Sequence, residues 1–394
     1  MISLRDQPRR ELGGPDPLDQ RLGQPPLSAQ AWLRSLLFTR SALGLAPSLT
    51  PAVIFLPLGA LLGPHGIGWF TPLVLGRLDT FVTITLAVLG VLVGIALGRE
   101  VRASFRLLVA ASFESAVTVA AVAGATIFFV RSAGVPLDPG AVIAFGLAFG
   151  LCASASSATS APPDSEAAAS VATKVADLDD VLPIVATTAI FAVVAPVGMA
   201  GLYAAAPVGI GLIVGVIGWL LFDRAESGAE RVVFVLGTLA LAGGAAAYLK
   251  VSPLAVGLVA GVFWVSARGR ADQIVTNDVQ RVQHPLIVLL LLTAGALWTP
   301  SQAALWLLAP YLFFRLVGKI AGAWVTARFL DVRTSDLAAF LMPPGVLAVA
   351  FALNFRQVLP PATGEILVST VAMGTAAFEL FALAVVPHWR RRRD

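Results

Sequence analysis

The sequence is short of charged residues, cysteine and histidine. Only 13% of its 394 residues are charged, whereas about 25% is usual in a soluble domain. The one cysteine, Cys152, excludes a disulfide framework and a cysteine-based zinc cluster. His65, His284 and His388 lie far apart in the sequence and form no metal-binding motif. The N-terminal segment has no apolar run before a small-residue cleavage site, so we predict no secretory signal peptide.

Apolar residues are in large excess instead. They make up 57% of the chain, against about 45–50% in an ordinary soluble domain, and the mean hydropathy is +0.85. A helix needs about 20 apolar residues to cross a bilayer, and this length predicts about twelve spans. The spans lie roughly at residues 49–67, 78–98, 105–130, 140–160, 177–199, 203–222, 231–249, 252–267, 284–299, 302–329, 336–356 and 364–387. We therefore predict an all-α polytopic membrane protein.

Composition divides the chain into three parts. Residues 1–47 alternate charged residues with proline and glycine, which predicts a polar cytoplasmic N-terminal tail. Residues 48–387 form the predicted transmembrane domain, and residues 388–394 a basic cytoplasmic tail. The sequence pI is about 9.7, but the excess positive charge lies in loops and tails, where it indicates membrane topology. We therefore expect a lipid bilayer around the protein and no nucleic-acid partner.

Basic residues mark alternate loops between the predicted spans. The loops on one side carry Arg99, Arg102, Arg106, Arg224, Arg231, Arg268, Arg270, Arg281, Arg328 and Arg333. The loops on the other side carry few basic residues, chiefly Arg77, Arg131, Lys250 and Arg356. Because cytoplasmic loops are enriched in lysine and arginine, we expect both termini to lie in the cytoplasm.

Two predicted spans are interrupted by paired prolines. Segment four, at 140–160, runs into Pro162 and Pro163, and segment eleven, at 336–356, contains Pro343-Pro344-Gly345. Proline lacks an amide donor and clashes with the preceding turn, so each pair should open its helix. The two segments are an odd number of spans apart and therefore run in opposite directions. Such matching breaks indicate inverted repeats with two broken helices that cross, although unrelated proline kinks are the alternative.

Three carboxylates enter segment five in the run Asp177-Leu178-Asp179-Asp180. A carboxylate near the bilayer centre costs roughly 2.5–3.5 kcal/mol, so its presence there predicts a function. Neighbouring helical residues point about 100° apart, so Asp179 and Asp180 cannot share one face. One of them can bind an ion while the other pairs with a base, and loop positions at the membrane surface are the alternative. For Asp177 we expect an ion pair with Lys174.

Segment ten supplies a candidate counter-charge for these acids. Lys319 lies in the middle of the span among small residues, which allow a neighbouring helix to come close. Arg315 is one turn away, and its long side chain can be expected to reach an interface. Glu114 in segment three and Glu379 in segment twelve are further intramembrane acids, for which a structural hydrogen bond and a transport role are both open.

Several motifs, in chain order, resemble the monovalent cation/proton antiporter superfamily, particularly its two-aspartate branch. Asp179-Asp180-Val181-Leu182 resembles that branch's Asp-Asp-Val-Leu at the ion-binding helix, and Gly318-Lys319 is similar to its membrane lysine. The resemblance runs from about residue 48 to 387. Its other motifs are residues 61–66, 94–100, 251–254 and 260–261, Ala158-Thr159-Ser160 and Phe378-Glu379-Leu380.

The resemblance implies a secondary active transporter that exchanges Na⁺ or K⁺ for protons by alternating access, with no cofactor and no enzyme activity. It implies that Asp180 is the principal carboxylate for the cation and the proton, and that Asp179 pairs with Lys319. It also implies that Thr159 and Ser160 are polar neighbours of the ion at the helix breaks. The expected assembly is a homodimer in a bacterial inner membrane.

The chain departs from that family in three ways. A polar tail replaces a leading helix, the interval from Ser160 to Asp179 is short, and Pro343-Pro344-Gly345-Val346 stands where many members have Pro-Arg-Gly-Glu. A sodium-coupled organic anion symporter of similar fold is therefore an alternative function. A magnesium-dependent membrane transferase that uses the aspartate cluster is a weaker one, since a second acidic motif is missing from the sequence.

Overall fold

The computed structural model describes most of the chain from Thr50 onward. The described residues are 50–134, 137–157, 166–196, 198–222, 224–267, 270–330, 332, 337–338 and 341–391. The predicted N-terminal tail and four predicted site residues, Thr159, Ser160, Pro162 and Pro163, lie outside these ranges. All regular secondary structure within them is helical.

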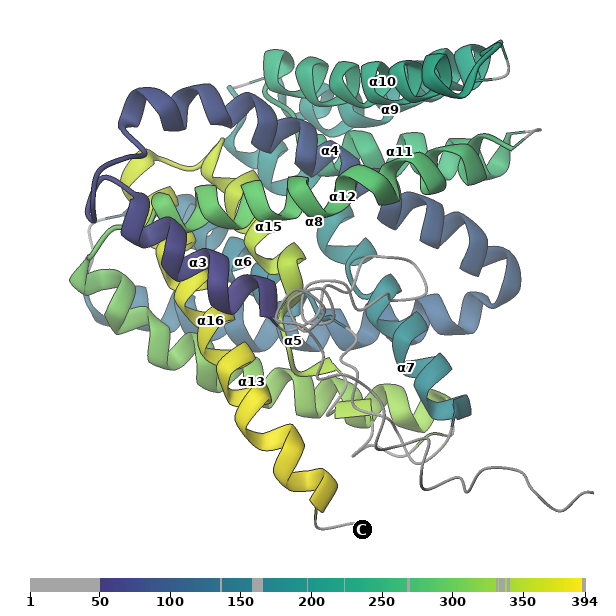
Figure 1. Ribbon diagram of the computed structural model, residues 1–394. Coiled ribbons are helices and arrows are strands. Elements are labelled where there is room, and N and C mark those ends of the chain that lie inside the picture. Colours follow the sequence, from purple (N-terminus) through teal and green to yellow (C-terminus); the bar gives the residue numbers. More distant parts are fainter. Residues whose placement is uncertain are drawn as a thin grey trace, which may run out of the picture. The chain divides into compact units, whose positions relative to one another are not determined.

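Each predicted span contains a helix (Figure 1). The helices are α3 (Thr50–Leu62), α4 (Pro72–Ala103), α5 (Phe105–Ser132), α6 (Pro139–Ser154), α7 (Glu166–Leu178), α8 (Val181–Val194), α9 (Ala200–Phe222), α10 (Gly228–Leu249), α11 (Pro253–Ser266), α12 (Ala271–Ala296), α13 (Gln302–Leu330), α15 (Gly345–Arg356) and α16 (Pro361–Arg391). The last helix passes the boundary predicted at residue 387. The prediction of an all-α polytopic membrane fold is confirmed.

The distribution of polar and apolar side chains suits a lipid environment. Within the described ranges, α4, α5, α9, α10, α12, α13 and α16 are each long and apolar enough to cross a membrane. Large apolar side chains point outward, among them Ile213 and Val233, which are 62% and 66% exposed. Arg315 and Lys319, by contrast, are 0% and 1% exposed. A soluble protein shows the opposite distribution, with charged residues almost never fully buried unless they are paired.

The shorter apolar helices reveal the internal repeat. They are α3, α6, α11 and α15, which are the first, fourth, eighth and eleventh spans, so α11 and α15 follow α3 and α6 at an offset of seven. The packing repeats at the same offset, because α3 contacts α12 and α4 contacts α11 (Figure 1). Each of these two interfaces joins the first segment of one repeat to the second segment of the other. The arrangement confirms the inverted repeats predicted from the proline pairs.

Glycine residues let the backbones in these equivalent interfaces touch. A Cβ atom on Gly94 of α4 would lie 2.2 Å from the carbonyl oxygen of Leu258 in α11. A Cβ atom on Gly59 of α3 would lie 2.3 Å from the carbonyl oxygen of Leu292 in α12. Neither distance is sterically possible. Small residues therefore set the spacing of both helix pairs, as is usual where lipid supplies no hydrophobic driving force between helices.

The two spans predicted at 177–199 and 284–299 differ from the prediction in organisation as well as in their ends. The span predicted at 177–199 consists of two helices, α7 and α8, that meet at Asp179 and Asp180. The span predicted at 284–299 begins earlier, since α12 starts at Ala271, and it carries Arg281 on the helix instead of in a loop. Ion pairs explain this second difference: Asp278, in the polar first half of α12, lies 3.2 Å from Arg231 of α10. Hydropathy alone cannot recognise a polar turn that is neutralised by a neighbouring helix.

We expect Gly94→Ala to destabilise the protein, because the added methyl group collides with the α11 backbone, and overpacking typically costs about 1–3 kcal/mol. Gly237→Ala in α10 is the matched control, since nothing lies within 4 Å of a Cβ atom there. This control should be neutral or stabilising by up to about 1 kcal/mol, the helix-propensity gain of alanine over glycine. Thermal melting in detergent measures both variants, and equal melting temperatures would contradict close packing at Gly94.

Candidate functional site

Two interruptions of the helices meet in the structure: one directly follows α6, upstream of the break predicted at Pro162 and Pro163, and the other is the predicted break before α15. Helix α6 ends at Ser154, and residues 155–157 continue without helical structure; residues 342–344 precede α15 in the same way. The Ser157 amide donates a hydrogen bond to the Pro343 carbonyl oxygen at 2.9 Å. Gly345 has a φ of +63°, and a Cβ atom on it would lie 2.9 Å from the Ser157 Cβ. Glycine is therefore required at this contact for both conformation and space.

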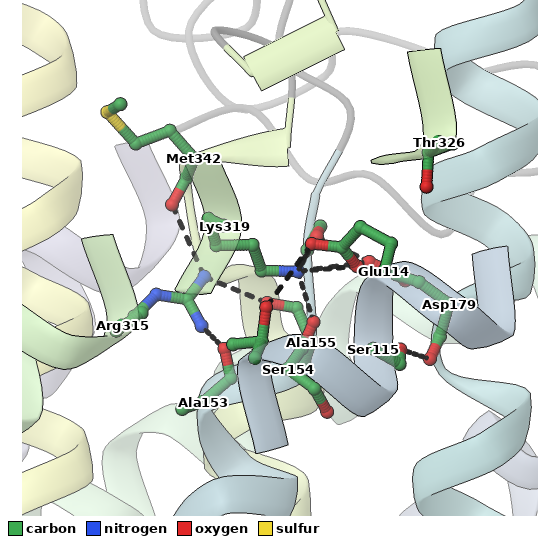
Figure 2. Close-up of polar contacts among 12 residues, drawn as sticks. Glu114, Ser115, Ala153, Ser154, Ala155, Asp179, Arg315, Lys319, Thr326 and Met342 are labelled. Atoms are coloured by element: carbon green, nitrogen blue, oxygen red, sulfur yellow. Dashed lines mark hydrogen bonds and ion pairs between the residues drawn. The ribbon is translucent and has the colours of Figure 1, made fainter. Parts of the chain in front are cut away.

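Arg315 of α13 neutralises the opened backbone at both breaks. Its guanidinium donates to the carbonyl oxygens of Ala153 and Ala155, the latter at 2.9 Å, and to that of Met342 at 3.2 Å (Figure 2). It also lies 5.3 Å from the centre of the Phe378 ring. Carbonyls at a helix end have no partner within the helix, and in a bilayer only protein can supply one. The expectation that Arg315 reaches an interface is wrong, because these carbonyls bind its head group inside the protein.

Asp179 and Asp180 lie between α7 and α8, next to the breaks. Asp179 is 0% exposed and Asp180 2%, so neither side chain lies in an exposed loop. Pro183 explains the interruption of the helix, since it has no amide to donate to the carbonyl of Asp179 four residues earlier. Ser115 of α5 donates its hydroxyl to that carbonyl instead. The junction is thereby attached to a neighbouring helix.

Lys319 of α13 lies at the centre of the cluster (Figure 2). Its Nζ atom is 3.1 Å from Oε1 of Glu114 on α5 and 3.3 Å from Oδ2 of Asp179. It also donates to the Ser156 hydroxyl at 2.5 Å and to the Ser154 carbonyl at the end of α6. The Ser156 hydroxyl in turn donates to Asp179 Oδ2. Each of these groups is buried, so one ammonium connects α5, the end of α6 and the α7–α8 junction.

Among the described residues, two carboxylate oxygens at this cluster have no hydrogen-bond partner. They are Oδ1 of Asp179 and Oδ1 of Asp180, both completely enclosed. Buried polar atoms are normally satisfied, so unpaired acceptors on adjacent carboxylates are a place where a cation or a proton can bind. Within the described residues, His, Cys, Asp and Glu side chains form no group of three or more that could hold a metal ion.

Two further predicted acids, Asp177 and Glu379, lie on α7 and α16. Asp177 is 8% exposed on α7, and Lys174 does not pair with it as expected, because Lys174 lies 3.2 Å from Glu100 of α4. Glu100 approaches from a neighbouring helix that the local sequence around Lys174 does not reveal. Glu379 is buried on α16, and its Oε2 atom has no hydrogen-bond partner among the described residues.

Sequence reasoning missed several contacts of this site. It gave Lys319 a single acidic partner, whereas the structure gives it two, and it assigned no role to Ser115, Ser154 or Ser156. A signal for the second partner was present, because Glu114 lies in a span that also carries Ser115 and Thr118 at helical spacing. The pairing itself depends on the contact between α5 and α13, which are far apart in the sequence.

We expect Lys319→Ala to lower thermal stability strongly, because it strands two buried carboxylates, and stranding one such charge typically costs about 3–5 kcal/mol. Adding Asp179→Asn should restore only part of the loss, and adding Glu114→Gln as well should restore more. Melting of the whole series in detergent at one pH measures this coupling. Losses that add to within about 0.3–0.5 kcal/mol would show that the three groups do not interact.

Lys174→Ala is the matched control for this series. Its ion pair with Glu100 is partly exposed, with side-chain exposures of 39% and 18%. Exposed ion pairs contribute about 0–1 kcal/mol to the free energy of unfolding, so replacing Lys174 should lower thermal stability only slightly. A loss as large as that of Lys319→Ala would mean that any lysine removal destabilises the protein.

Comparisons with known proteins agree with this fold. Neither a family model nor a curated protein sequence matches the chain. Among solved structures, the sodium proton antiporter MjNhaP1 from Methanocaldococcus jannaschii, determined at pH 8, matches with a TM-score of 0.57 and 16% sequence identity. The match covers 86% of this chain and 90% of that one. At this identity the likeness concerns the fold alone, and the chain therefore shares the polytopic membrane fold of that protein.

Proposed function

We propose that the protein is a secondary active transporter that exchanges a monovalent cation, Na⁺ or K⁺, for protons. The observation that carries the proposal is the pair of adjacent buried carboxylates, Asp179 and Asp180, each with an unpaired oxygen, where the two helix breaks meet. Breaks of this kind near the middle of the membrane are typical of transporter binding sites. The likeness in fold to a protein described as a sodium proton antiporter supports the same reading.

Competition at one carboxylate accounts for exchange. Asp179 is already engaged through Oδ2 with Ser156 and Lys319. Asp180 begins α8 without a capping hydrogen bond from its side chain, so its carboxylate is available to a proton or to a dehydrated cation, but not to both. If the site opens to one side of the membrane at a time and only when it is occupied, each inward movement of one ion requires outward movement of the other. Alternating access of this form is part of the proposal.

The proposal also covers the membrane in which the protein lies, its orientation and its oligomeric state. We place the protein in a bacterial inner membrane with both termini in the cytoplasm, on the strength of the basic loops. The homodimer is inferred from the family resemblance. The symporter alternative uses the same fold, but Lys319 and Arg315 already have acidic or carbonyl partners and are not free to bind an organic anion. The arrangement therefore favours a cation as the bound ion.

We expect Asp180→Asn to abolish cation-dependent proton movement, because asparagine keeps the shape of the side chain but cannot exchange a proton. Everted membrane vesicles report this movement as a change of an acid-sensitive dye on addition of Na⁺, K⁺ or Li⁺. The variant should still insert and purify. Near-normal exchange in Asp180→Asn would remove this residue from the mechanism.

Asp272→Asn is the control for this experiment. It makes the same chemical change on α12, where Asp272 forms a part-exposed ion pair with Arg99 at 2.9 Å. Exchange should persist in this variant. Loss in both variants would point to a general defect of assembly and would leave Asp180 without a specific role.

We expect reporter fusions at residues 99–106 around the α4–α5 junction, at the segment between α11 and α12, and at the C-terminus to report the cytoplasm. The basic residues of these segments are the physical reason. Fusions in the α10–α11 connection, at Lys250, should report the opposite side. A C-terminal fusion that reports the outside would imply an odd number of spans and would contradict the proposed orientation.

A further inference from the structure

Glu114 is the carboxylate nearest to Lys319, and exchange at Asp180 does not itself require it. Its Oε1 and Oε2 atoms lie 3.1 Å and 3.2 Å from the Lys319 Nζ, whereas the Asp179 Oδ2 lies at 3.3 Å. Glu114 is 0% exposed, and Thr118, one turn further along α5, donates to it at 3.4 Å. Lys319 thus has two acidic partners, which come from different elements.

The second partner matters when a cation binds. If Asp179 were the sole partner, a cation bound between Asp179 and Asp180 would compete with Lys319 for the same carboxylate. An ammonium left without a partner in the low-dielectric interior is unstable, and releasing its proton would remove the charge. The cycle would then move a second proton. Because Glu114 contacts the same Nζ atom, Lys319 retains a carboxylate partner whichever ion is bound.

The other ionisable groups around Glu114 and Lys319 do not offer Glu114 a different cationic partner. Asp179, Asp180 and Asp177 are acids, and they lie at or near the α7–α8 junction. Arg315, on the same helix as Lys319, is engaged with the carbonyls of the two breaks. Within the part of the chain that the structure describes, Lys319 is therefore the cation that neutralises Glu114.

We infer that Glu114 keeps Lys319 charged throughout the cycle, so that one proton is exchanged for one cation and no net charge crosses the membrane. The inference rests on the proposed function. In the balance, Asp180 releases one proton as it takes up one monovalent cation. Glu114 and Asp179 remain ionised and Lys319 remains an ammonium in both loaded states. The cluster therefore carries the same charge whether the proton or the cation is bound.

The test uses the purified full-length protein in liposomes that contain a pH-sensitive dye. The cation gradient at which internal pH stops changing is measured without a membrane potential and with about 100 mV imposed by a thiocyanate gradient. One elementary charge across 100 mV is equivalent to about 2.3 kcal/mol, or about fifty-fold in the balancing gradient. The wild-type gradient should not move. A shift approaching fifty-fold would overturn the inference, whereas absence of any exchange would overturn the proposed function with it.

Variants test whether Glu114 is the reason that the balancing gradient does not respond to membrane potential. Glu114→Gln removes the second partner, and its balancing gradient should move with potential, by up to about fifty-fold for each net charge. Glu114→Asp keeps the charge and should behave as the wild type. Glu100→Gln makes the same change outside the cluster and should also leave the gradient fixed. The inference would be overturned if the balancing gradient of Glu114→Gln did not change with membrane potential, or if that of Glu100→Gln did. If Glu114→Gln does not fold, the wild-type and Glu114→Asp measurements decide.

Discussion

The centre of this structure depends on the contacts of one buried ammonium group. Lys319 joins Glu114 on α5, the end of α6 and the α7–α8 junction through contacts to two carboxylates, a hydroxyl and a carbonyl. A bilayer offers no water to satisfy broken helices and buried acids, so every such group needs a protein partner. Without this charge, two acids and a helix end would lose their common partner.

The two cations on α13 bind different kinds of group. Lys319 serves mainly carboxylates, and Arg315, one turn before it, serves backbone carbonyls at both breaks. This division bears on the absence of the Arg and Glu that many members of the similar family carry near Pro344. In this chain the second break receives its positive charge from a different helix, through the Met342 carbonyl. The acids at the α7–α8 junction each retain one oxygen without a hydrogen-bond partner among the described residues.

The scaffold around the site is rigid where the repeats meet. Helix pairs α4–α11 and α3–α12 contact one another through glycine backbones, and such contacts have little freedom to adjust. The site, by contrast, is built from short helices and non-helical segments held by individual polar contacts.

Sequence alone determined the membrane class, most of the spans and the broken segment at Pro343-Pro344-Gly345, because hydropathy and proline act locally along the chain. It also placed Asp179, Asp180 and Lys319 in membrane segments, since charge is rare there. The tertiary structure decided which groups meet: Glu114 with Lys319, Lys174 with Glu100, and Arg315 with the breaks rather than an interface. These partners come from helices remote in sequence, and ion pairs depend on the distance between side chains, which no local pattern encodes.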